Sequence, residues 1–142
     1  MAAVIPGLPV ELQIVPPAPH SPADPEATQK WVAWLAWREQ VRHYRAVRVA
    51  ACSDPTQQKI ELVKCRDSRA YFMTVYGTLH EPRRRKSGAG QPPFIPFEKQ
   101  VELLDLLDAC LHAEEGDDQD AVISKCRDVG ATWVLATAAV HD

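Results

Sequence analysis

The sequence predicts a mainly α-helical protein that also contains the first strand and phosphate-binding loop of an incomplete α/β domain. Three observations lead to this prediction. Apolar side chains recur at helical spacing over much of residues 28–112. Seven prolines interrupt residues 1–28. A short apolar run, a loop with a glycine and the start of a helix follow from residue 120. With 142 residues, the chain is long enough for one small domain with a hydrophobic core.

The cysteines and the apolar runs indicate a soluble, intracellular protein. No two of the four cysteines have C-x-x-C spacing, and no paired histidines stand near them, which argues against a zinc site and for a reduced compartment. The longest apolar runs are far shorter than the roughly 20 residues that cross a bilayer. No basic start, apolar core and cleavage site of a secretory signal are visible at the N-terminus.

The net charge of −3 conceals a strong asymmetry along the chain. Residues 1–28 carry −3, residues 29–90 carry +8 and residues 91–142 carry −8, which together give the net value. Such a division fits a basic surface for a polyanion beside an acidic half. It fits equally well two halves that pair with each other or face water.

Residues 1–28 are expected to form an extended or disordered, proline-rich leader ahead of a helical region that begins at residue 29. Proline fixes φ and removes a backbone donor, so that this stretch lacks both helix and sheet signals. The leader is either a docking tail for a partner or an untethered terminus.

A long helix is predicted from Thr28, as its N-cap, to about Ala51, before Ser53-Asp54-Pro55. Spacings of three and four define an aromatic face, which comprises Trp34, Trp37, Val41, Tyr44 and Arg48. The same spacing defines a neighbouring row, made of Arg38, Arg42 and Arg45. This arginine row either contacts a nucleic-acid backbone or is a solvated helix face.

Three further helices are predicted. A short one covers Ile60–Cys65, and Ser68 caps a second that ends at Tyr76, where a strand is the alternative. A mobile basic loop with Arg83-Arg84-Arg85-Lys86 follows, which would attract phosphates without reading sequence. A localisation signal or a solvated loop would give the same pattern. An amphipathic helix is then predicted from about Phe97 to His112.

Residues 120–133 have the order strand, tight loop and helix start, in which backbone N–H groups and a helix N-terminus converge on an anion. The Walker A pattern G-x-x-x-x-G-K-[ST] is met in part, by Gly130 and Thr132. Lys125 stands where the first glycine belongs, and Ala131 where the lysine belongs. A lysine five residues before the glycine can fold back toward the same phosphates. The same order also occurs in α/β proteins that bind no nucleotide.

The succession of segments resembles the N-terminal part of the large terminase subunit of tailed bacteriophages, the ATPase that pumps DNA into the capsid. The resemblance covers about residues 29–142, and the matching segments are Lys64-Cys65-Arg66-Asp67 with Tyr71-Phe72, Pro93-Phe94-Ile95-Pro96-Phe97, and residues 125–133. It implies a P-loop NTPase fold, ATP and Mg²⁺ as cofactors, and a phage or prophage protein in the cytoplasm of a bacterial host. It also implies double-stranded DNA, the small terminase subunit and the portal protein as partners, with no membrane and a ring in the parent protein.

The resemblance assigns roles to individual residues. It implies that Lys125 contacts the β- and γ-phosphates, that Arg127 senses or stabilises the γ-phosphate as the catalytic arginine, and that Thr132 helps to hold Mg²⁺. Gly130 would give the tight turn. The rest of the nucleotide-binding loop would be Cys126, Asp128, Val129 and Ala131, with Cys126 replacing the family's usual serine. The family reads adenine with a glutamine just after an aromatic residue, so Glu98 or Gln100 would serve here, after Phe97.

The sequence beyond the loop lacks an apolar strand that ends in Asp-Glu, and hence a Walker B carboxylate, and it lacks the family's nuclease domain. We therefore expect a fragment, a decayed remnant or one half of a split gene, which alone does not hydrolyse ATP. The alternative is a non-enzymatic, helical DNA- or protein-binding module with no nucleotide binding.

Overall fold

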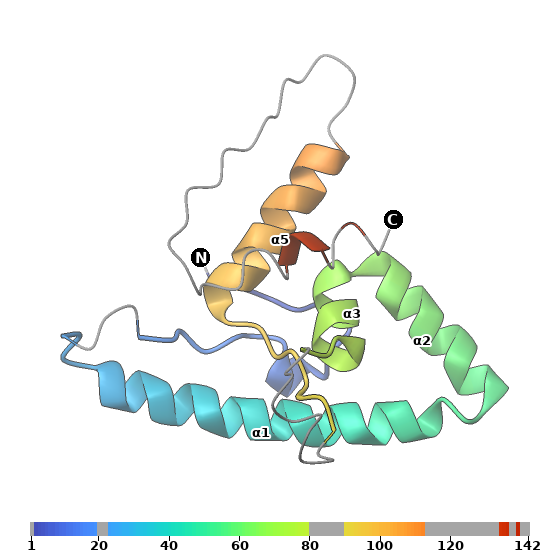
Figure 1. Cartoon of the computed structure of the whole chain (residues 1–142), viewed down its shortest axis with the longest axis horizontal. Helices are drawn as coiled ribbons and strands as arrows, with labels where there is room; N and C mark the ends of the chain where they lie inside the picture. Colours follow the sequence, from blue (N-terminus) through green and yellow to red (C-terminus); the bar gives the residue numbers. More distant parts are fainter. Residues whose placement is uncertain (1, 20–22, 80–89, 113–133, 137–138, 140–142) are drawn as a thin grey trace.

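The computed structural model describes residues 2–19, 23–79, 90–112, 134–136 and 139. Within these residues the protein is mainly helical, as predicted, and the only β-pairings are two isolated bridges. The helices with described bounds are a 3₁₀ turn, η1 (Val10–Leu12), and four α-helices, α1 (Ala27–Ala51), α2 (Pro55–Asp67), α3 (Arg69–Tyr76) and α5 (Glu98–Leu111). The long α1 forms the base, α2 turns back from its end, and α3 lies between α2 and α5 (Figure 1).

The short α3 is the central helix, in contact with α1, α2 and α5. Most of its side chains are buried: Arg69, Ala70, Tyr71, Met73, Thr74 and Val75. Ser68 caps it as predicted, because the Ser68 hydroxyl accepts a hydrogen bond from Tyr71 N at 3.1 Å. The prediction of a helix rather than a strand is thus confirmed here.

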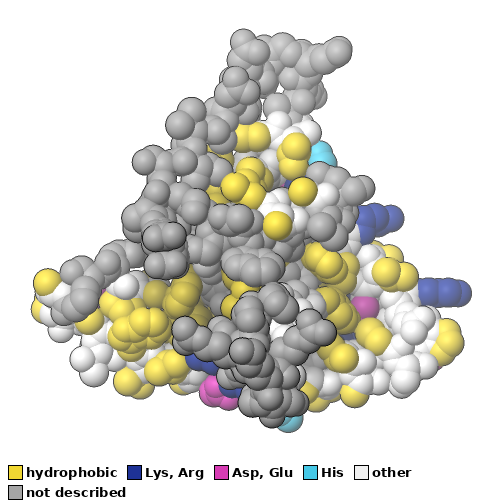
Figure 2. Space-filling view, in the orientation of Figure 1, with side chains coloured by type: hydrophobic (Ala, Val, Ile, Leu, Met, Phe, Trp, Pro, Cys, Tyr) yellow, Lys and Arg dark blue, Asp and Glu magenta, His cyan; other side chains and the backbone are white. Residues whose placement is uncertain are grey.

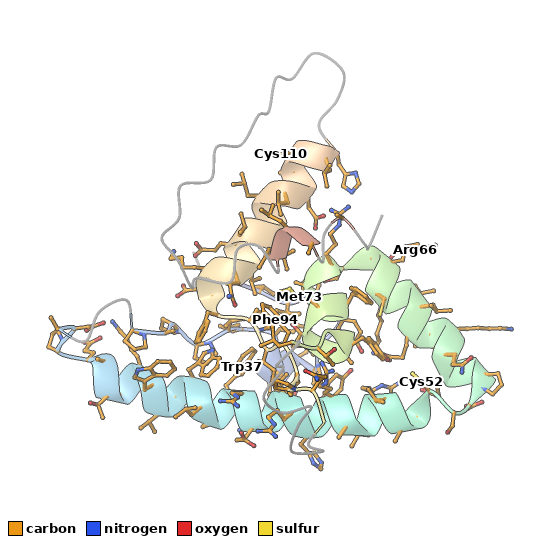
Figure 3. The ribbon with its side chains drawn as sticks, viewed as in Figure 1. Trp37, Cys52, Arg66, Met73, Phe94 and Cys110 are labelled. Carbon is orange, nitrogen blue, oxygen red and sulfur yellow. The ribbon has the colours of Figure 1, made fainter. Side chains whose placement is uncertain are left out.

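The core fills the space between these helices. Trp37 of α1, Met73 of α3 and Phe94, which precedes α5, point toward one another at the centre of the molecule (Figure 3). The buried face of α1 begins with Trp34 and continues through Trp37 and Val41, as the predicted aromatic face requires. The buried residues of α5 are Val101 and Leu104.

The ends of α1 and α2 differ in part from the prediction. Helix α1 begins at Ala27, so Thr28 lies inside the helix and is not its N-cap; instead an Asp24 carboxylate oxygen accepts a hydrogen bond from Glu26 N at 2.9 Å just before the helix. Helix α2 is longer than Ile60–Cys65, because Asp54 caps its first turn and Pro55 occupies the first helical position. The segment Ser53-Asp54-Pro55 therefore both ends one helix and starts the next.

The expectation of a disordered leader is wrong for residues 2–19. Ile5 N donates to Gln13 O at 2.8 Å and Val15 N to Ala3 O at 3.0 Å, which closes a loop around η1. The apolar residues between the prolines are buried in the core: Ala3, Ile5, Leu8, Leu12 and Val15. Proline keeps its carbonyl as an acceptor, and Pro9 O receives the Leu12 N–H at 2.8 Å, so proline content did not prevent packing.

The predicted phosphate-binding loop, residues 120–133, and the basic segment at 83–86 lie outside the described residues. Residues 134–136 are helical, in agreement with the helix predicted after the loop, and Val134 is fully buried in the core. Before the basic segment, Leu79 N donates to Pro92 O at 2.9 Å, and Phe94 N donates to Gly77 O at 3.1 Å. These bonds bring together the two chain segments that flank residues 80–89.

Replacement of Gly7 by alanine should destabilise the protein by roughly 1–3 kcal/mol. Gly7 has a φ of +94°, and a Cβ atom there would lie 2.9 Å from Cδ2 of Tyr71. Gly90→Ala is the control, since a Cβ atom at that position meets no atom within 4 Å. Urea unfolding followed by circular dichroism measures both variants. Equal stability of the two would mean that residues 2–19 do not pack against α3.

Candidate functional site

The predicted site residues divide into two groups. The loop residues Lys125–Thr132, with the catalytic arginine and the predicted Mg²⁺ ligand, lie outside the described residues. The predicted adenine-reading residues, Glu98 and Gln100, are described and lie in the first turn of α5. Of the predicted site, the structure therefore describes only the two residues at the start of α5.

The Gln100 side chain is part of the helix cap. Its Oε1 accepts a hydrogen bond from Phe97 N at 2.9 Å, and Gln100 N donates to Phe97 O at 2.9 Å. This bond satisfies one of the donors that a helix N-terminus leaves open. To read an adenine with both its oxygen and its nitrogen, Gln100 would have to give up the cap. Glu98, half-buried at the first helical position, does not take part in this cap.

Three aromatic rings meet where α5 begins. The Phe97 ring stacks on Trp34 with centroids 4.4 Å apart and an interplanar angle of 22°. Trp31 stands edge-on to both rings, at 5.6 Å from Trp34 and 6.1 Å from Phe97. Trp34 Nε1 is buried without a hydrogen-bond partner among the described residues. This cluster fixes the start of α5 against α1.

A buried carboxylate, Glu61, joins α1, α2 and α3. The Glu61 residue is 2% exposed. Its Oε1 faces cations, with Arg48 Nη2 at 2.8 Å, Arg48 Nε at 3.0 Å and Lys64 Nζ at 3.4 Å. Its Oε2 accepts from two phenols, Tyr71 at 2.5 Å and Tyr76 at 2.9 Å. Both oxygens are thus fully used, as a buried charge requires.

The network continues beyond the two phenols. Because Tyr71 and Tyr76 give their hydrogens to Glu61, the next groups act as donors: the Tyr44 hydroxyl to Tyr71 at 3.2 Å and the Cys52 thiol to Tyr76 at 3.3 Å. Cys52 lies at the end of α1, near the turn into α2 (Figure 3). The network therefore fixes the α1–α2 corner.

The protonation states follow from these contacts. Burial raises the pKa of the Glu61 carboxyl, but the hydrogen bonds from Tyr71 and Tyr76 and the charges of Lys64 and Arg48 outweigh burial, so the pKa is lowered. Burial and the bond to Glu61 raise the pKa of the Tyr71 phenol. The site is thus an ionised carboxylate held by neutral phenols. Such groups neither accept nor release a proton near neutral pH, which indicates a structural role.

The arginine row does not form a continuous basic surface. Arg45 Nη1 donates to Thr74 O at 3.1 Å and is half-buried, so it holds α1 to α3. Arg42 pairs with Glu39 at 3.2 Å on the surface, and the Arg38 guanidinium lies 5.6 Å from the Trp34 ring centroid. Only Arg42 is exposed among the three. Phosphate contact by the whole row would require Arg45 to leave its carbonyl partner.

The cysteines and carboxylates of the described residues show no catalytic arrangement. Burial raises the pKa of the Cys65 thiol to about 11, which makes it a poor nucleophile. Within the described ranges, no three His, Cys, Asp or Glu side chains are placed to hold a metal ion.

In the same part of the chain, no helix is long and apolar enough to cross a membrane.

Sequence reasoning missed the Glu61 network. One signal was available, because Arg48 continues the aromatic face of α1, and an arginine on a buried face requires an acidic partner. The sequence did not indicate which carboxylate this was.

In comparisons with known proteins, no family model, no curated protein and no solved structure matches the chain significantly.

Replacement of Glu61 by glutamine should cost roughly 2–4 kcal/mol of stability, because Arg48 then loses its buried counter-charge. Urea unfolding measures the change. Glu102→Gln is the control, since Glu102 pairs with Lys99 on the exposed side of α5 and its loss should change stability by less than about 1 kcal/mol. Equal effects of the two substitutions would contradict a structural role for Glu61.

Stability should be highest between the ordinary pKa values of Glu, 4.5, and Tyr, 10.0. The lowered pKa of Glu61 means that its contribution is present above 4.5 and is lost as the pH falls through the folded-state value. The raised pKa values of Tyr71 and Tyr76 mean that theirs is present below 10.0 and is lost as the pH rises through the folded-state values. Denaturation midpoints measured from below pH 4.5 to above pH 10.0 test both losses. An unchanged acid limit in Glu61→Gln would contradict this assignment.

Proposed function

We propose that the chain supplies the N-terminal part of a DNA-packaging motor ATPase, with a nucleotide-binding loop at Lys125–Thr132. One observation carries the proposal. The loop pattern stands between two segments that both enter the same core, α5 through Val101 and Leu104 and the following helix through the fully buried Val134. A loop that binds phosphates needs such fixed flanks, because its backbone N–H groups must converge on one anion.

In this proposal the loop residues have the roles that the family resemblance implies. Lys125 contacts the β- and γ-phosphates of ATP, Arg127 stabilises the γ-phosphate, and Thr132 helps to hold Mg²⁺. Glu98 takes the adenine-side position, because Gln100 is engaged in the cap of α5. The partners are double-stranded DNA, the small terminase subunit and the portal protein, in the cytoplasm of a bacterial host.

Lys125→Ala should weaken ATP binding by the full-length gene product at least about tenfold, a loss of about 1.4 kcal/mol. A fluorescent ATP analogue, titrated in the presence of Mg²⁺, measures the affinity. Lys99→Ala is the matched control, because Lys99 is an exposed lysine of α5 whose partner is Glu102. An unchanged affinity in Lys125→Ala would exclude the assigned loop.

The alternative function, a DNA- or protein-binding module without nucleotide, gives a different pattern in the same experiment. The protein would then bind no ATP analogue, and its DNA affinity would depend on Arg83–Lys86 and not on Lys125. DNA binding would also fall steeply with salt, because each phosphate contact releases counterions.

A further inference from the structure

A surface hollow lies between the N-terminal segment and the middle of α1. Its volume is about 560 Å³, within the range of ligand-sized sites. The N-terminal segment contributes one wall and α1 the other; the lining residues are Pro9, Glu11, Leu12, Glu39, Gln40, His43, Tyr44 and Val47. None of these lining residues belongs to the aromatic cluster at the start of α5.

The walls of the hollow are fixed by contacts outside it. Trp37 Nε1 donates to Leu12 O at 3.0 Å and thereby holds η1 against α1. Gln13 Nε2 donates to Leu8 O at 2.9 Å and closes the loop around η1. The Tyr44 hydroxyl is held by Tyr71 at 3.2 Å, so the position of the ring is set by the Glu61 network. A preformed site of this kind loses little conformational entropy when it is filled.

The charged side chains among the described lining residues are acidic. Among the lining residues that the structure describes are two carboxylates, Glu11 and Glu39, and no lysine or arginine. The pair between Glu39 and Arg42 is exposed, at 3.2 Å with side chains 64% and 46% exposed, and such a pair is easily exchanged for another cation.

Apart from Gln40 and His43, the remaining lining residues are apolar or aromatic. Leu12, Pro9 and Val47 present hydrocarbon, and Val47 is 51% exposed. Val10, which lies between the lining residues Pro9 and Glu11 in the sequence, is 81% exposed. The Tyr44 ring is a surface on which a guanidinium or ammonium can lie. Phosphates are disfavoured here by the two carboxylates, which distinguishes this surface from a nucleic-acid site.

We propose that this hollow binds a basic, apolar segment of a partner protein, with an arginine or lysine between Glu11 and Glu39 and an apolar side chain on Leu12 and Val47. Charge complementarity and the preformed apolar floor together select this occupant. The proposal does not rest on nucleotide binding, since it is argued only from the described residues that line the hollow.

The test uses the full chain and a short fluorescent peptide of alternating leucine and arginine, with a leucine–glutamate peptide as the charge control. Fluorescence anisotropy should show saturable binding of the basic peptide alone. The double variant Glu11→Gln, Glu39→Gln should weaken it roughly threefold to tenfold, and Val47→Lys should abolish it. Glu102→Gln should bind as the unsubstituted protein does. Unchanged melting temperatures would show that the variants remain folded.

Several results would overturn the proposal. These are no saturable binding, equal binding of the acidic peptide, or unchanged affinity in the double variant. Binding only after Arg83–Lys86 are replaced by glutamine would identify the chain's own basic segment as the occupant. Loss of binding as the protein self-associates, seen by sedimentation, would identify a second copy. Loss of ATP binding in Lys125→Ala with peptide binding intact would separate this surface from the nucleotide proposal.

Discussion

The ion pair and hydrogen bonds of the buried Glu61 carboxylate are the interaction on which the helical arrangement depends. Glu61 is the only fully buried residue of α2, whereas the apolar side chains Ile60, Leu62 and Val63 are 44%, 68% and 48% exposed. Helix α2 is therefore attached to the rest of the protein mainly by this buried charge, with Cys65 as a partly buried apolar contact with the core. A buried carboxylate is tolerated only when every lone pair is used, so α1, α2 and α3 must all be in place together. This requirement selects one arrangement of the α1–α2 corner, because a shift of α2 along its axis would leave the Glu61 charge unpaired.

The same requirement places the exposed hydrophobic side chains of α2 on the outside of the molecule, where Figure 2 shows hydrophobic side chains beside lysine and arginine.

Tyr71 extends this constraint into the core. Its hydroxyl donates to Glu61, its ring is fully buried, and Gly7 of the N-terminal segment lies directly against the ring. The Tyr71 side chain thus connects the N-terminal segment to the Glu61 network. A second ion pair, between the buried Arg69 and Asp108, joins α3 to α5. Helix α3 is short, but its contacts explain how it organises the fold. Polar side chains link it to α2 on one side and to α5 on the other, and its apolar side chains pack in the core.

The sequence predicted those parts of the fold in which spacing determines burial. Trp34, Trp37 and Val41 recur at three and four residues, so α1 and its buried face could be identified without a structure. The way in which α2 is attached could not be predicted, because helical periodicity reveals buried apolar residues and the buried residue of α2 is charged. The N-terminal segment was misassigned because its prolines dominated the pattern, whereas its apolar residues follow an irregular spacing that suits a loop. At the candidate site, Gln100 was identified as a polar group near Phe97, but its use as a helix cap depends on where α5 begins, which sequence patterns determine only to within a few residues.

Helix α1 connects the two surfaces to which functions are proposed here. Its 25 residues form a rod of about 37 Å. Near its start, Trp34 stacks on Phe97 and fixes the beginning of α5, beside the proposed adenine-side residue. In its middle, Glu39, His43 and Val47 line the hollow. Its last turns carry Arg48, which holds Glu61. A partner in the hollow would therefore rest on the same rigid element that supports the first turn of α5, and the Glu61 network would resist any rotation of that element.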